Sequence, residues 1–200
     1  MSPVEPSSND AAGPWPALPL YLTARGLTTS PLPYGRPTFE LTFDFLAQAL
    51  LLRDSDGIVQ RIGLYPRSVA DFYQELMSAL QAMGYPIKIW PVPVEIPDPI
   101  PFASDTQPPA YDAEHVQRFW RILLQVEQVF KQFQGGFVGK SSPVQYYWES
   151  FDLCLSRFSG RATPPHPSGI PFVVEASSCH PSGYSDSVSL GQVLWPPSAN

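Results

Sequence analysis

Two carboxylates and a histidine lie in proline-rich stretches, where rigid positioning could serve acid–base chemistry. Glu95 and Asp98 occur in Val-Glu-Ile-Pro-Asp-Pro-Ile-Pro, and His166 occurs in Pro-Pro-His-Pro. Proline fixes the backbone angle φ, and a general acid or base must be held within reach of the proton that it transfers. A stiff loop lying on a sheet would have the same composition without a catalytic role. These three residues are the catalytic candidates, and the sequence identifies no reaction for them.

Three arginines near expected turns are candidates for binding an anionic ligand. Arg25 lies in Thr-Ala-Arg-Gly-Leu-Thr-Thr, Arg67 precedes the positive end of an expected helix, and Arg157 ends an apolar segment. A guanidinium donates hydrogen bonds in a planar fork that suits carboxylate and phosphate oxygens. Internal ion pairs would explain the same arginines equally well, and the available carboxylates are Glu40, Asp44 and Asp152.

The remaining reactive residue types do not have the spacing of a known site. The three histidines, at positions 115, 166 and 180, include no pair with the close spacing of a structural zinc site. Cys154 lies in an apolar pattern and Cys179 in a polar segment, which favours reduced, unreactive thiols. The segment Gly139-Lys-Ser-Ser142 is similar to the end of a phosphate-binding loop but lacks the upstream glycine at the required spacing. We therefore predict no metal site and no cofactor.

Charge and hydropathy argue against two classes of partner. The 200 residues include 12 basic and 18 acidic ones, for a net charge of −6, and no basic cluster could neutralise a row of phosphates. The longest apolar run, residues 49–52, is far shorter than the roughly 20 residues that cross a bilayer. Residues 1–16 lack the basic start and apolar stretch of a secretory signal. We expect a soluble cytoplasmic protein that binds neither nucleic acid nor membrane.

The pattern of apolar residues predicts the elements that must position these candidates. Phe39 to Phe45 alternates apolar and polar side chains, as a strand with one face in water does. Residues 50–53 and 58–64 flank a turn ending in Asp-Gly, so three consecutive antiparallel strands are expected. Helices are predicted from the cap Ser68 to Gly84 and from the cap Asp112 to Gly135-Gly136. Shorter strand-like segments are residues 18–24, 86–90, 144–158 and 170–176, while turn residues fill 26–37.

Strands followed by helices and further strands, without regular alternation, predict an α+β fold with a mainly antiparallel sheet. Its two principal helices are expected to be joined by long proline-rich connections, because the chain contains 25 prolines. We expect a disordered lead-in at residues 1–16, a single α+β domain at 17–176 and a loosely ordered tail rich in Pro, Ser and Gly at 177–200.

Several motifs resemble a bacterial family catalogued as domain of unknown function 5996. The resemblance runs from about residue 18 to 167 and includes residues 20–35, Pro66-Arg-Ser-Val-Ala-Asp-Phe-Tyr73, residues 90–102 and Pro164-Pro-His-Pro167. Family members look longer at both ends. Where the family tends to have His after Ser-Pro-Val, this chain has Gln145. Where it tends to have His-Glu in Tyr-Ser-His-Glu-Val-Ser, this chain has Asp186 and Ser187.

These differences imply a shortened, diverged member and favour a binding role over catalysis. Neither a neutral amide nor a serine replaces a titrating base in proton transfer. The expected function is a non-catalytic domain that binds a small anionic ligand or a protein partner. The alternatives are an enzyme using the proline-rich acid–base residues and a degenerate paralogue without function. A shortened chain would expose apolar surface, so self-association is a further expectation.

Overall fold

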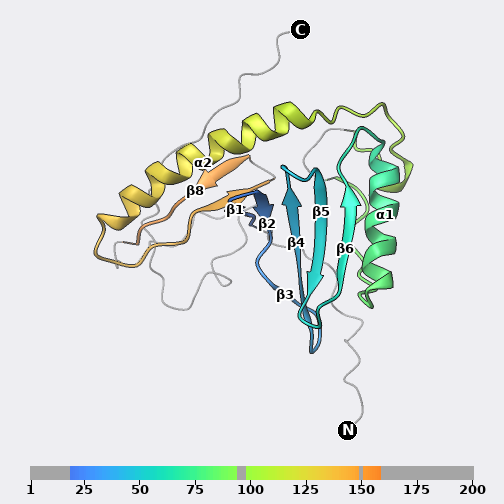
Figure 1. Ribbon diagram of the computed structural model, residues 1–200, viewed down its shortest axis with the longest axis horizontal. Coiled ribbons are helices and arrows are strands. Elements are labelled where there is room, and N and C mark those ends of the chain that lie inside the picture. Colours follow the sequence, from blue (N-terminus) through green and yellow to red (C-terminus); the bar gives the residue numbers. More distant parts are fainter. Residues whose placement is uncertain (1–18, 94–97, 149–150, 159–200) are drawn as a thin grey trace, which may run out of the picture.

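The computed structural model describes residues 19–93, 98–148 and 151–158, and it confirms the α+β class with a mainly antiparallel sheet. The main sheet has the order β1-β2-β4-β5-β6, with β3 paired to β4, and a separate hairpin is formed by β7 and β8. Figure 1 shows α2 running along this hairpin and α1 lying beside β6. The strands are β1 (Tyr21–Thr23), β2 (Gly26–Thr28), β3 (Leu32–Pro33), β4 (Thr38–Asp44), β5 (Ala49–Asp54), β6 (Val59–Gly63), β7 (Gln145–Tyr147) and β8 (Asp152–Cys154).

The three consecutive strands expected from the sequence are β4, β5 and β6. Pairing of Phe43 with Leu50, and of Leu50 with Ile62, places these apolar residues on one face of the sheet. Gly57 closes the β5–β6 turn with a φ of 88°, which glycine adopts without the steric cost of a Cβ. On the opposite face the hydroxyls of Thr28 and Thr42 lie 3.0 Å apart. The alternation of apolar and polar residues therefore separates a covered face from a polar one.

Helix α1 (Val69–Ala82) begins and ends where its capping residues predict. The hydroxyl of Ser68 accepts a hydrogen bond from the backbone N–H of Asp71 at 3.1 Å, which satisfies one free donor of the first turn. Leu80 and Met83 pack against the sheet residues Leu50, Leu52 and Ile62, all of them buried. Local capping therefore fixes the ends of α1, and apolar burial fixes its position on the sheet.

Helix α2 (Ala113–Gly135) crosses the other end of the same face and joins the main sheet to the hairpin. Its Trp120 and Leu123 are buried together with Tyr146 of β7, whose side chain is inaccessible to solvent. The backbone groups of Tyr146 and Leu20 exchange two hydrogen bonds of 2.8 Å, so the hairpin continues next to β1. The cap Asp112 accepts a bond from His115 N–H at 2.9 Å, as the sequence predicts.

Three local predictions were wrong. The turn-rich segment 26–37 contains the short strands β2 and β3. Both are strands because they form backbone hydrogen bonds with β4. Residues 86–90 form no strand, because Pro86 lacks a donor and Ile87 N–H bonds to Tyr85 C=O at 2.7 Å within its own turn. Residues 144–158 form a hairpin instead of one strand, and Phe151 has the left-handed φ of 54° at its reversal. The segment 170–176 lies outside the described residues.

Candidate functional site

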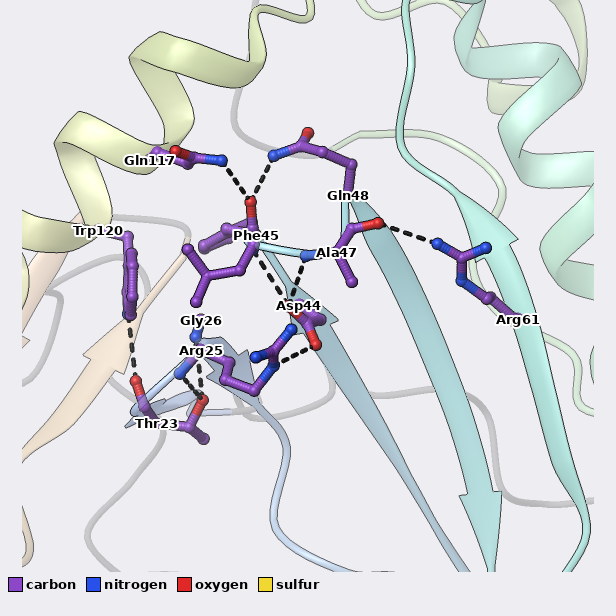
Figure 2. Close-up of polar contacts among 11 residues, drawn as sticks. Thr23, Arg25, Gly26, Asp44, Phe45, Ala47, Gln48, Arg61, Gln117 and Trp120 are labelled. Carbon is purple, nitrogen blue, oxygen red and sulfur yellow. Dashed lines mark hydrogen bonds and ion pairs between the residues drawn. The ribbon is translucent and has the colours of Figure 1, made fainter.

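Arg25 is held at one end of the main sheet by Asp44, the last residue of β4. Its Nε lies 2.6 Å from Asp44 Oδ2, and the other carboxylate oxygen accepts the N–H groups of Ala47 at 2.8 Å and Leu46 at 3.1 Å (Figure 2). Burial alone would raise the pKa of Asp44. The hydrogen bonds from Arg25 and these amides, together with the charge of Arg25, outweigh burial and lower that pKa. Asp44 is therefore a fixed carboxylate that shapes the β4–β5 turn.

The carbonyl oxygen of Phe45 in the same turn connects β4 to α2. It accepts hydrogen bonds from the side-chain amides of Gln48 and of Gln117, the second at 2.9 Å (Figure 2). The oxygen of the Gln48 amide in turn accepts the hydroxyl of Tyr111. Trp120 Nε1 donates to Thr23 C=O at 3.1 Å and ties α2 to the β1–β2 turn as well. This network fastens α2 across the end of the sheet, which favours a structural role for Arg25 at its edge.

Arg67 lies at the same end of the sheet, just before α1. Its side chain is only 9% exposed and is placed between two rings, with Cζ 4.6 Å from the centroid of Tyr65 and 4.9 Å from that of Phe72. The guanidinium donates to Glu75, to Gly63 C=O at 2.9 Å and to the Tyr65 hydroxyl at 3.3 Å. These bonds use three of its five N–H groups. The buried Nε is one of the two that have no acceptor within the described part of the chain.

A pocket of about 380 Å³ opens next to Arg67, between the start of α1 and the segment leading to α2. The pocket is open to solvent on one side, and its wall consists mostly of apolar side chains with a few polar groups. Arg67 supplies a cation and Asp105 a carboxylate, and the hydroxyl of Tyr111, which also lines the pocket, donates its hydrogen to Gln48. The apolar part of the wall includes Tyr65, Val69, Phe72, Pro108 and Pro109.

The N–H groups at the start of α1 are largely in use. Ala70 N–H donates to Asp105 C=O at 3.0 Å, and Asp71 N–H donates to the Ser68 hydroxyl. Any anion in the pocket would therefore depend on Arg67 more than on the helix terminus. Burial raises the pKa of Tyr111, and the negative charge of Asp112 adds to this effect, so its phenol remains a hydrogen-bond donor near neutral pH.

The three arginines do not converge. Gly26, Asp44, Ala49 and Gly63 are partners in successive strands, so the turns carrying Arg25 and Arg67 are about three strand spacings, or roughly 14 Å, apart. Arg157 lies at the other end of α2. Its Cζ is 3.1 Å from the ring centroid of Phe133 and 4.8 Å from that of Phe137.

The acid–base candidates are not assembled by the described residues. Asp98 is exposed, has a φ of 49°, and its carboxylate takes part in no hydrogen bond or ion pair there. Glu95 and His166 lie outside the described ranges. Within those ranges no three His, Cys, Asp or Glu side chains are grouped as metal ligands would be. No helix of the same ranges is long and apolar enough to span a bilayer.

The sequence did not point to several residues that define these sites. Gln48, Gln117 and Tyr111 form the network at the β4–β5 turn, yet their partners are up to 72 residues away. Neither residue type nor local spacing distinguishes such glutamines from ordinary surface residues. Pro108 and Pro109 belong to the expected proline-rich connection between the helices, and they also form part of the pocket wall.

Comparison with known proteins supports the resemblance carried by the sequence motifs. Neither the curated proteins nor the solved structures include a match to the chain. A model of a family of unknown function, DUF5996, matches residues 7–195, which is most of the chain. The protein therefore belongs to the family of unknown function DUF5996.

Proposed function

We propose that the protein is a non-catalytic binding domain that holds a small organic acid in the pocket beside Arg67. The observation that carries this proposal is a guanidinium fixed in the pocket wall, in which one N–H group of Nη2 has no acceptor among the described residues. The carboxylate of the ligand would bind Arg67, and an aromatic or aliphatic body would pack on Tyr65, Phe72 and the two prolines. Arg25 and Arg157 lie outside this pocket.

Arg67 is suited to binding a carboxylate because the neighbouring aromatic rings fix its side chain before a ligand binds. Rotamer freedom of a long side chain costs free energy when it is lost on binding, and this arginine is already ordered by Tyr65, Phe72 and Gly63. A planar cation between aromatic rings keeps its in-plane N–H groups available for a carboxylate.

Two carboxylates near the pocket oppose anion binding, so substituting them tests whether the pocket binds an acid. Glu75 pairs with Arg67, but it is 45% exposed, so water screens much of that interaction. Asp105 lines the pocket, and one of its oxygens accepts Gln107 N–H at 3.2 Å. Removing either negative charge should therefore strengthen the binding of an acid.

A non-catalytic role is supported by the residue at position 145. The family resemblance places a histidine there, whereas β7 of this chain carries Gln145, whose amide cannot transfer a proton at neutral pH. Within the described residues, the carboxylate of Asp98 also makes no hydrogen bond or ion pair that could serve proton transfer. Cytoplasmic location and self-association stay predictions.

The first experiment is a thermal-shift screen with aromatic and aliphatic monocarboxylates. A ligand at about a hundred times its Kd stabilises by roughly 2.7 kcal/mol, which raises Tm by about 5–10 °C in a protein of this size. Arg67→Met should abolish the shift, and Glu75→Gln should tighten binding by about threefold. Arg121→Met is the matched control, because Arg121 is an exposed arginine of α2. A shift of equal size in Arg67→Met, or none across the panel, would overturn the proposal.

A further inference from the structure

We propose a second site, in which Arg157 and Ser141 bind an oxyanion such as a phosphate or carboxylate group at the carboxyl end of α2. This site is independent of the pocket beside Arg67. It rests on a cation without a counter-charge among the described residues and on a hydroxyl placed beside that cation.

Arg157 is held by aromatic rings and has no polar side-chain partner in the part of the chain that the structure describes. Its guanidinium lies over Phe133 and near Phe137, so stacking fixes the plane of the group. Within the described ranges its side chain makes no hydrogen bond and no ion pair, in contrast to Arg25 and Arg67. Its Nε is enclosed without an acceptor. The four N–H groups of its two terminal nitrogens are therefore the donors that remain open to a ligand.

Ser141 supplies a second donor next to Arg157. The two residues face each other in an antiparallel bridge, flanked by hydrogen bonds from Ser142 N to Ser156 O at 2.8 Å and from Phe158 N to Lys140 O at 2.9 Å. This pattern makes Ser141 and Arg157 a non-hydrogen-bonded pair, whose side chains leave the strands on the same side with Cβ atoms about 4.5–5.5 Å apart.

The hydroxyl of Ser141 is oriented by α2. Gln134 Nε2 donates to Ser141 Oγ at 2.9 Å and to Ser142 C=O at 2.9 Å, which uses both of its N–H groups. Ser141 Oγ is thereby an acceptor toward Gln134, and its own hydrogen is left to donate. An oxyanion that bridges the Arg157 terminal nitrogens and this hydroxyl would receive charge-assisted hydrogen bonds from both.

Within the described ranges no carboxylate forms an ion pair with Arg157, although the whole chain is negative. Lys140 is exposed in the same loop, while the nearby Lys131 is paired with Glu127 at 2.9 Å. The negative end of the α2 dipole opposes an anion, but it amounts to only about half a charge. A rival explanation is that Arg157 merely stabilises this helix end, in which case its charge would matter for stability and no anion would bind.

The test is a titration of the ¹⁵N-labelled full chain with inorganic phosphate, at constant ionic strength maintained with chloride. We expect saturable shifts in the amide signals of residues 133–142 and 155–158. Arg157→Gln should weaken binding by about tenfold or more, and Ser141→Ala by about threefold. Arg121→Gln removes the same charge from an exposed position of α2 and should leave the Kd unchanged. Arg157→Lys keeps the charge without the planar fork and should bind at an intermediate level if Arg157→Gln does not fold.

Acetate serves as a second probe, because a carboxylate can satisfy the same donors. Saturation by either anion at these residues, weakened in Arg157→Gln, supports the site and shows which oxyanion it prefers. Shifts that grow linearly with salt across the protein, or an unchanged Kd in Arg157→Gln, would overturn it. Saturable shifts confined to Ser68, Val69 and their neighbours would assign the anion to the pocket beside Arg67 and would also overturn this second site.

Discussion

An ion pair between Arg25 and Asp44 links the β1–β2 turn to the β4–β5 turn, with Nε and Oδ2 2.6 Å apart. The partners differ in environment, because the Arg25 side chain is 55% exposed and that of Asp44 only 8%. The free energy of the contact therefore depends mainly on the carboxylate, which also receives two backbone N–H groups. Removing the carboxylate leaves two part-buried backbone donors without this acceptor, whereas removing the arginine exposes one oxygen to water.

Asp44→Ala should lower the free energy of unfolding by about 2–3 kcal/mol, because the amides of Leu46 and Ala47 lose their acceptor. Asp44→Asn keeps an oxygen for these amides and should cost less. Urea unfolding followed by circular dichroism measures both values. Equal stability of the Ala variant and the wild type would show that water replaces the carboxylate in this turn.

Acid should destabilise the protein partly through Asp44. Its pKa in the folded state lies below the usual 3.8, because its hydrogen bonds and Arg25 outweigh burial. Its contribution is therefore complete above the unfolded pKa and is lost as the pH falls through the lower folded pKa. Asp112, whose pKa is lowered first of all by the N–H of His115, acts in the same direction. Between about pH 5 and pH 2, the unfolding free energy of Asp44→Asn should fall less steeply than that of the wild type.

Gln48 and Gln117 should show strong energetic coupling, because both donate to Phe45 C=O. Gln117→Met alone should cost about 1 kcal/mol, since Gln48 still satisfies the carbonyl. Loss of both amides leaves the carbonyl without a donor from either side chain. The double variant should therefore lose about 1 kcal/mol more than the sum of the single variants. An additive double-mutant cycle would show that the two bonds are independent.

Tyr146→Phe should leave stability unchanged or raise it by up to about 1 kcal/mol. The Tyr146 side chain is fully buried, and its hydroxyl has no hydrogen-bond partner among the described residues. Burial, the larger cause, and the charge of Asp152 raise the pKa of this phenol, so the group is neutral at physiological pH. Removing an unsatisfied hydroxyl eliminates a desolvation cost without creating a large cavity. A lower Tm for Tyr146→Phe would indicate that the hydroxyl has a partner, such as a bound water.

Gly26→Ala should be strongly destabilising because β2 and β4 approach closely there. A Cβ at this position would lie 1.9 Å from the carbonyl oxygen of Phe43, which belongs to the backbone and cannot rotate away. We expect a loss of about 3 kcal/mol or more, measured by thermal unfolding. Gly135→Ala is the matched control, since a Cβ at the end of α2 meets no atom within 4 Å. Similar losses in both variants would point to a general effect of the added methyl group.

The regular elements followed from local sequence because their causes are local. Alternating side chains around Phe43 and the turn ending at Gly57 predicted β4 to β6, and the caps Ser68 and Asp112 predicted the starts of both helices. The short strands β2 and β3 were missed, since only their pairing with β4 makes them strands. The strand predicted at residues 86–90 does not form for the opposite reason. The composition of this segment is typical of a strand, but no neighbouring strand pairs with it.

Sequence alone determined the residue types available for binding, and tertiary structure decided which of them are occupied. Three arginines were equivalent candidates on the printed chain. Folding paired Arg25 with Asp44, placed Arg67 in a pocket wall beside Glu75, and left Arg157 on two phenylalanine rings, with no counter-charge among the residues that the structure describes. Partner choice of this kind depends on contacts between residues far apart in the chain, as in the 63-residue separation of Tyr111 and Gln48. The periodicity of apolar residues depends only on residues that are close in the sequence. It therefore predicts helices and strands, whereas contacts between distant residues are determined by tertiary packing.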